Sequence, residues 1–195
     1  MIHNLISKSG QFDSFKVKGK NRDRDMGHII NLSRGQVVMI NHLEASEVFV
    51  PLTVIGEGVV VIQNVYGEKF GGDLCDLWAS NVYIKNLHGQ EDMPTRPYNV
   101  YHPDAVQVER LVDYKPSHYA CQQHIEINNI DVVMKNPDAG GITMSGLHQY
   151  YAMKFGFEKL KMHLKNEHIV NGYSANELEV GGPDVDVTGD VYINS

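Results

Sequence analysis

The stretch Val60-x-Ile62-x-Asn64-Val65 decides how this chain folds, because its pattern returns at intervals of 22 residues. The pattern is an apolar residue, Ile two positions later, Asn or His two positions after that, and then an apolar residue. The other copies are Val38-x-Ile40-x-His42-Leu43, Val82-x-Ile84-x-Asn86-Leu87, Ile125-x-Ile127-x-Asn129-Ile130 (43 residues further on) and the start of a copy at Val191-x-Ile193. A fixed period of this kind predicts a solenoid, because one unit cannot bury its apolar face without stacking on its neighbours.

Side chains alternate within each copy, as they do along a β-strand. Val60 and Ile62 would point to one side of the strand, and Val61 and Gln63 to the other. Strands stacked about 4.8 Å apart would place the Val and Ile residues in an interior column. The Asn residues that would form a ladder at a turn are Asn64, Asn86 and Asn129. The sequence therefore predicts an all-β fold, a single-stranded parallel β-helix with rungs of about 22 residues.

The chain of 195 residues fits one domain. Residues 1–14 are expected to form an N-terminal cap and residues 15–195 the β-helix. Two long loops are expected to leave the stack: residues 87–124, which hold four prolines, and residues 146–159, which are rich in Tyr and Phe. Residues 157–164 fit either a strand or a helix, and the strand is preferred because the neighbouring units are strands.

Composition narrows the class of protein. With 18 Gly, 7 Pro and 21% charged residues, the chain suits a turn-rich fold, and its net charge of −7 argues against binding to nucleic acid. No apolar run approaches the roughly 18 residues of a membrane span, and no secretory signal is visible at the N-terminus. Cys75 and Cys121 are too few for a disulfide framework, and the ten His residues show no metal-ligand spacing. We therefore expect no disulfide, no metal site and no membrane segment.

The C-terminal residues 191–195 fall inside an expected rung. An uncovered terminal rung exposes unpaired edges and apolar core. Either the chain is a piece of a longer one, or another copy covers this end. The sequence therefore favours a homo-oligomer, with a trimer as the usual solution for a β-helix.

Two segments resemble the pectate lyase-like β-helix superfamily, which includes polygalacturonases, pectate lyases and phage tailspike depolymerases. Residues 72–86 (GDLCDLWASNVYIKN) are similar to its Asp-Gly-Ile-Asp, turn, Asn-Val-x-Ile-x-Asn coil, and residues 102–108 (HPDAVQV) to a His-Pro-Asp-Gly-x-Gln stretch. Leu74 and Ala105 stand where the usual glycines would be. The chain also lacks the Arg-x-Lys and Gly-His-Gly elements, which argues against a polygalacturonase. In architecture the likeness covers roughly residues 30–195, and it implies a protein that acts on polysaccharides.

Hydrolysis of a glycosidic bond needs two carboxyl groups on one surface, one protonated and one ionised. Asp73, Asp76 and Asp104 are the candidates, provided that residues 73 and 104 occupy equivalent places in successive coils. His102 and Gln107 would then lie nearby and bind sugar hydroxyls. Each Asp also fits a structural role, because Asp before an apolar strand commonly caps a turn.

A lyase would instead need a base, for which Arg96, Arg110 and Lys85 are the candidates, and a cation or a basic group on the uronate carboxylate. A bound calcium ion is expected only in that case; otherwise no cofactor is expected. Arg96, Tyr150 and Tyr151 are candidates for substrate binding, and the two tyrosines fit an oligomer interface equally well.

Two functions follow from these patterns. The first is a carbohydrate-directed β-helix that degrades or binds a polysaccharide, as a tailspike does, and works outside the cell or on a virion. The second is a non-catalytic part of a virion appendage, in which the β-helix is a stiff trimeric spacer. The fold alone does not decide between them, because one scaffold carries many functions.

Overall fold

The computed structural model describes residues 2–91, 103–108 and 124–135, and beyond them the backbone of the strands at 140–144, 161–164, 167–171, 185–187 and 191–194. Every element in this part of the chain is a β-strand, and no helix occurs in it. The strands are β1 (Ile2–Ile6), β2 (Gly10–Lys18), β3 (Met26–Leu32), β4 (Val37–Ser46), β5 (Leu52–Phe70), β6 (Cys75–Glu91), β7 (Asp104–Val108), β8 (His124–Met134), β9 (Gly140–Met144), β10 (Lys161–Leu164), β11 (Glu167–Asn171), β12 (Val185–Val187) and β13 (Val191–Asn194).

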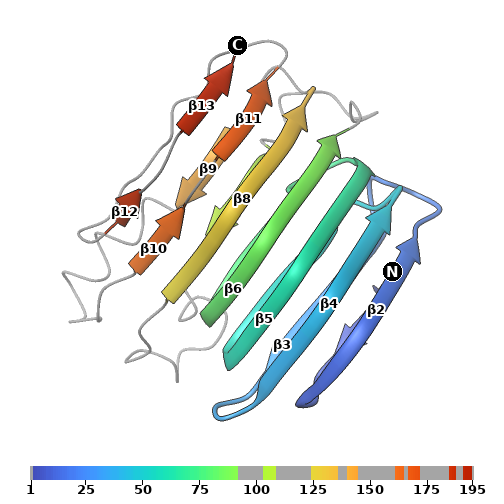
Figure 1. Ribbon diagram of the computed structural model, residues 1–195. Helices are drawn as coiled ribbons and strands as arrows, with labels where there is room; N and C mark the ends of the chain where they lie inside the picture. The colour runs from blue at the N-terminus through green and yellow to red at the C-terminus, as the bar shows by residue number, and fades with distance from the viewer. Residues whose placement is uncertain are drawn as a thin grey trace, which may run out of the picture.

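The strands stack in parallel as a β-solenoid, which confirms the predicted fold class. Residues 2–91 supply about four turns at a spacing of about 24 residues, formed in order by β1 with β2, β3 with β4, β5, and β6. Strands β7 to β13 continue the stack, which runs from β2 near the N-terminus to β13 at the other end (Figure 1).

Each rung has three faces, because β5 and β6 each bend twice and pair along their whole length. The first face consists of β1, β3, residues 52–56 and 75–79, β7 and β9. The second consists of residues 10–12, 37–40, 59–62, 81–84 and 124–127, β10 and β12. The third consists of residues 14–18, 42–46, 64–68, 86–90 and 129–133, β11 and β13.

The register follows the sequence repeat. Ile40 lies opposite Ile62, Ile62 opposite Ile84, and Ile84 opposite Ile127. All four side chains are buried in one apolar core, at 2% exposure or less. The column of inward Val and Ile residues predicted from the 22-residue period is therefore confirmed. The 43-residue spacing before Ile127 also fits, because residues 104–108 form β7 on the first face before β8 begins.

The prediction that Val191 and Ile193 continue the column of Val60 and Ile62 is wrong. Val191 pairs with Glu167, and Glu167 pairs with Ile130, which places Val191 on the third face. The strand that continues the second-face column is β12, whose Val185 pairs with Met162 and thereby stacks above Ile125. The reason is that an alternating apolar pattern repeats every two residues and does not by itself fix which inward position it occupies.

The second and third faces meet at a corner where two successive residues face outward. Ile62 and Val65 are both buried, whereas Gln63 and Asn64 between them are half-buried. The strand bends there without losing its parallel pairing. This corner confirms the expected Asn ladder, although it is a bend within a continuous strand rather than a turn after it.

The ladder at this corner runs through the Asn side chains. Asn86 Nδ2 donates to Asn64 Oδ1 at 2.8 Å, and Asn129 Nδ2 donates to Asn86 Oδ1 at 2.8 Å. At its lower end, Asn64 Nδ2 donates to the backbone oxygen of Asn41 at 3.0 Å. Each rung is thereby fixed to the next by a side-chain bond as well as by the backbone.

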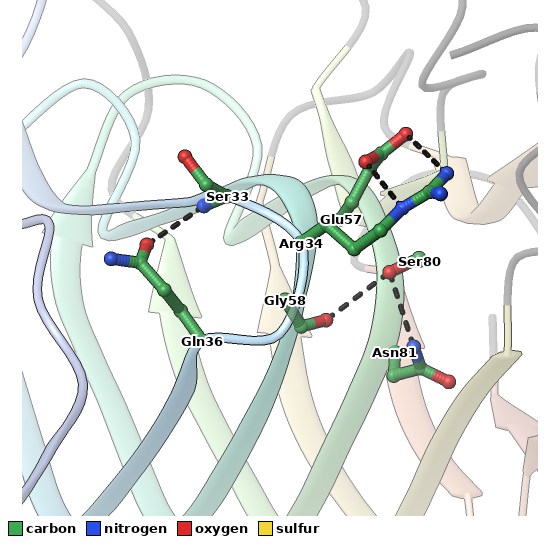
Figure 2. Close-up of polar contacts among 7 residues, drawn as sticks. All are labelled: Ser33, Arg34, Gln36, Glu57, Gly58, Ser80 and Asn81. Carbon is green, nitrogen blue, oxygen red and sulfur yellow. Dashed lines mark hydrogen bonds and ion pairs between the residues drawn. The ribbon is translucent and has the colours of Figure 1, made fainter.

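The first and second faces meet at a polar corner that Figure 2 shows. Arg34 forms an ion pair with Glu57 of the next rung at 3.1 Å, and Ser80 Oγ donates to the backbone oxygen of Gly58 at 3.2 Å. Gly56 begins this corner with a φ of +113°, and a Cβ atom there would lie 1.8 Å from the backbone oxygen of Leu32. Only glycine satisfies both conditions, so Gly56 allows the two rungs to approach.

The expected N-terminal cap, the expected loops and the ambiguous segment 157–164 can be compared with the described strands. Residues 2–6 and 10–18, within and beyond the expected cap, pair in register with β3 and β4 as a rung, and Phe12 and Phe15 pack against the core. Within residues 87–124, where a long loop was expected, residues 87–91 belong to β6 and residues 104–108 form β7, and residues 92–102 and 109–123 lie outside the described residues. The preferred strand is confirmed at 161–164, and the loop at 146–159 lies outside the described residues.

Cys75 is a fully buried free thiol on the first face. Burial, together with the charges of Asp76 and Asp73, raises the pKa of this thiol well above its ordinary value. It is therefore an apolar core residue, as expected. Cys121 lies outside the described residues.

Candidate functional site

The three candidate Asp residues, Asp73, Asp76 and Asp104, lie near the start of the first face. Asp73 Oδ1 accepts a hydrogen bond from the backbone nitrogen of Asp104 at 2.6 Å, and the backbone nitrogen of Leu74 donates to the backbone oxygen of Asp104 at 2.9 Å. Residues 73 and 104 thus begin equivalent parts of neighbouring rungs. The Asp73 carboxylate holds the start of β7, and the Asp104 residue is 1% exposed.

Asp76 and Gln107 are paired neighbours on the outer side of the same face, and both are half-buried. The structure therefore brings together Asp73, Asp76, Asp104 and Gln107 within two rungs. Their described contacts are structural, and a catalytic role for the three Asp residues remains a prediction. The other candidates, His102, Arg96, Arg110, Tyr150 and Tyr151, lie outside the described residues.

A larger groove lies on the third face, over the C-terminal parts of β4, β5, β6 and β8, which lie side by side in Figure 1. Its volume is about 550 Å³. The residues that line it are His42, Glu44, Tyr66, Gly67, Glu68, His88, Gly89, Gln90, Asp131 and Val133. This is the size range of sites that enclose small ligands.

Three rings form a stack along the groove. The rings of Tyr66 and His88 are 4.8 Å apart at an interplanar angle of 14°, and those of His42 and Tyr66 are 5.1 Å apart at 37°. Tyr66 and His88 are paired in register on adjacent rungs. Because paired residues of a parallel stack lie about 4.8 Å apart, the backbone itself sets the distance for ring stacking. Tyr66 remains 39% exposed, so the stack offers an aromatic surface to solvent.

Carboxylates flank this stack. In the column through Tyr66 and His88, Glu44 is the neighbour on one side and Asp131 the neighbour on the other, and Lys16 precedes Glu44. Glu44 forms an ion pair with Lys16, and the hydrogen bond from Lys16 lowers the pKa of Glu44 below its ordinary value. Asp131 Oδ2 lies 3.7 Å from His88 Nδ1. The groove thus combines an aromatic platform with carboxylate hydrogen-bond acceptors.

On the inner side of this face, the side chain of Leu74 lies so close to Gly67 and Gly89 that a larger residue at either position would meet it. A Cβ atom on Gly67 would lie 2.3 Å from a methyl carbon of Leu74, and one on Gly89 would lie 2.5 Å from the other. Leu74 itself is fully buried. Leu74, which stands where the resembling family has a glycine, therefore fills the interior behind the groove floor.

The groove was not predicted, although the sequence contains a signal of it. Glu44, Tyr66 and His88 are each 22 residues apart, which is the repeat period, and each precedes a small residue. An alignment of the repeats shows an outward column of this composition. The residue types differ from rung to rung, however, so no repeated motif marks the column.

A smaller hollow of about 210 Å³ lies over the second face and the corner. It contains Lys85, one of the candidate bases of a lyase, together with Tyr83, Glu126 and Asn128. The ring of Tyr83 lies 5.4 Å from that of His124. This hollow would admit a single small group rather than a polymer.

Comparisons with protein-family models, with curated proteins and with solved structures return no match to this chain. Within the described ranges, no three His, Cys, Asp or Glu residues are placed to hold a metal ion together. The described part also contains no helix with the length and apolarity to cross a membrane.

Proposed function

We propose that the protein is a carbohydrate-directed parallel β-helix that holds an extended glycan in the groove of its third face. The observation that carries the proposal is the exposed Tyr66–His88 stack with carboxylates on either side. Sugar rings present a C–H face that packs on aromatic rings, and their hydroxyl groups donate to carboxylates. The likeness of residues 72–86 and 102–108 to the pectate lyase-like superfamily supports the same class of ligand.

Tyr66→Ala tests this proposal, with Tyr83→Ala as the matched control. Tyr83 is an outward tyrosine on the second face and does not line the groove. Binding is measured on a glycan array, and the affinities of the hits by calorimetry. Tyr66→Ala should weaken binding at least tenfold, about 1.4 kcal/mol, and Tyr83→Ala should leave it unchanged. Equal effects of the two variants, or an array with no hit, would rule out the groove as a glycan site.

Cleavage of the glycan is a step beyond binding and would belong to the Asp residues of the first face, which do not line the groove. Release of reducing ends would indicate a hydrolase, and an unsaturated product absorbing in the near ultraviolet would indicate a lyase. Asp104→Asn should abolish either release, and because Asp104 is 1% exposed, its melting temperature is measured alongside to distinguish lost catalysis from lost folding. A wild-type protein that binds glycans and releases nothing is a binding module.

One observation favours the second function, a structural spacer. Val37 and Met39 point outward from β4 on the second face and are 42% and 45% exposed. Exposed apolar side chains that lie together commonly pack against a partner. A trimeric spacer, extracellular or on a virion, would cover them. Sedimentation equilibrium should then show a trimer that Met39→Glu dissociates, and a wild-type monomer at all concentrations would exclude this function.

A further inference from the structure

The charge of the groove restricts the glycans that it accepts. Three carboxylates line it, those of Glu44, Glu68 and Asp131, and its lining residues include neither Lys nor Arg. Lys16 and Lys69 contact Glu44 and Glu68, but both lie outside the lining and are 67% and 55% exposed. The two lysines therefore offset part of the negative charge at Glu44 and Glu68.

A carboxylate on the ligand would meet like charges at close range. Glu44 stays ionised through its bond to Lys16, so it does not take up a proton to accommodate a second carboxylate. Like charges in a partly enclosed groove repel each other more strongly than in bulk water. A hydroxyl group instead donates to the same oxygens, and such a bond to an ionised acceptor is stronger than a bond between neutral groups.

We propose that the groove selects glycans whose sugars carry no carboxylate or sulfate, and that it excludes uronate polymers. This inference rests on the proposed function and names the ligand class of the same groove. It also separates this groove from the lyase hypothesis, which needs a cation or a basic group on a uronate carboxylate. Selection arises from Glu44, Glu68 and Asp131, and the ring stack supplies the surface on which an uncharged ring packs.

The experiment compares pairs of related polymers in which one member carries carboxylates and the other does not. The pairs are methyl-esterified and free oligogalacturonides, dextran and carboxymethyl-dextran, and xylan and glucuronoxylan, with affinities measured at low and high salt. In each pair that binds, the uncharged member should bind at least tenfold more tightly at low salt, and the difference should shrink as salt rises. Equal or tighter binding of the acidic member overturns the inference but leaves the glycan proposal standing. If no pair and no array glycan binds, the proposed function fails and this inference fails with it.

Glu68→Gln provides the second measurement. The Glu68 side chain is 60% exposed, so the substitution should not impair folding. It should raise the affinity for the acidic member of a pair. The ratio of the affinities for the uncharged and the acidic member should fall at least threefold. Glu126→Gln is the matched control, because Glu126 lines the smaller hollow on the second face. An unchanged preference in Glu68→Gln, or an equal change in Glu126→Gln, would show that the groove charge does not select the ligand.

Discussion

His28 is an imidazole enclosed between the first and third faces, with 1% of the residue exposed. Asn4 Nδ2 donates to its Nδ1 at 3.0 Å, and its Nε2 donates to the backbone oxygen of Glu44 at 2.9 Å. These two bonds suit the neutral ring with its proton on Nε2. Burial lowers the pKa of His28 below its ordinary value, against the opposing effect of the bond to Glu44. The ring therefore stays neutral in the folded chain at pH values where an exposed His is charged.

This burial predicts a loss of stability in acid. The unfolded chain binds a proton at His28 near pH 6.5, whereas the folded chain binds it only at lower pH, so the free energy of unfolding falls as pH drops below 6.5. His28→Gln should be less stable than the wild type by roughly 1–3 kcal/mol at pH 8, and this difference should shrink toward pH 5.5. Urea denaturation at both pH values measures it. If the free energy of unfolding changed by the same amount between the two pH values in both proteins, His28 would not take up a proton on unfolding.

At the scale of the strands, the Asn ladder provides side-chain bonds between rungs that one substitution removes. Asn86 donates to Asn64 and accepts from Asn129, so Asn86→Ala removes two bonds and leaves two half-buried amides without these partners. A cost of about 1–3 kcal/mol in unfolding free energy is expected. Lys85→Ala, an exposed position on the same strand, should stay within about 0.5 kcal/mol of the wild type. A ladder variant as stable as Lys85→Ala would mean that the backbone alone fixes the register.

The strands of this fold could be predicted because the inward residues must recur. A parallel stack gives Ile40, Ile62 and Ile84 the same surroundings, so the same residue type returns every 22 positions. The outward column at Tyr66 has no such requirement, since each outward residue meets solvent and differs from rung to rung. The groove was therefore missed while the core was predicted.

Insertions limited the site prediction in a different way. Asp76 pairs with Gln107, an offset of 31 residues rather than 22, because extra residues lie between β6 and β7. The sequence suggested that residues 73 and 104 are equivalent, and their contact agrees with this. It gave no indication that Asp73 would bond to the backbone of Asp104, because that depends on how the inserted chain re-enters the stack.

At the scale of the whole molecule, each rung contacts only its neighbours, so stability should be distributed along the stack. Ile62 is fully buried between rungs on both sides, whereas Ile6 belongs to the first rung and has a described neighbour on one side only. Ile62→Ala should cost about 2–5 kcal/mol and lower amide protection throughout residues 2–91. Ile6→Ala should lower protection mainly in β1 and β2 and leave β6 protected. Native-state hydrogen exchange measures both patterns, and equal loss of protection in β1 and β6 of Ile6→Ala would show that the rungs open as one unit.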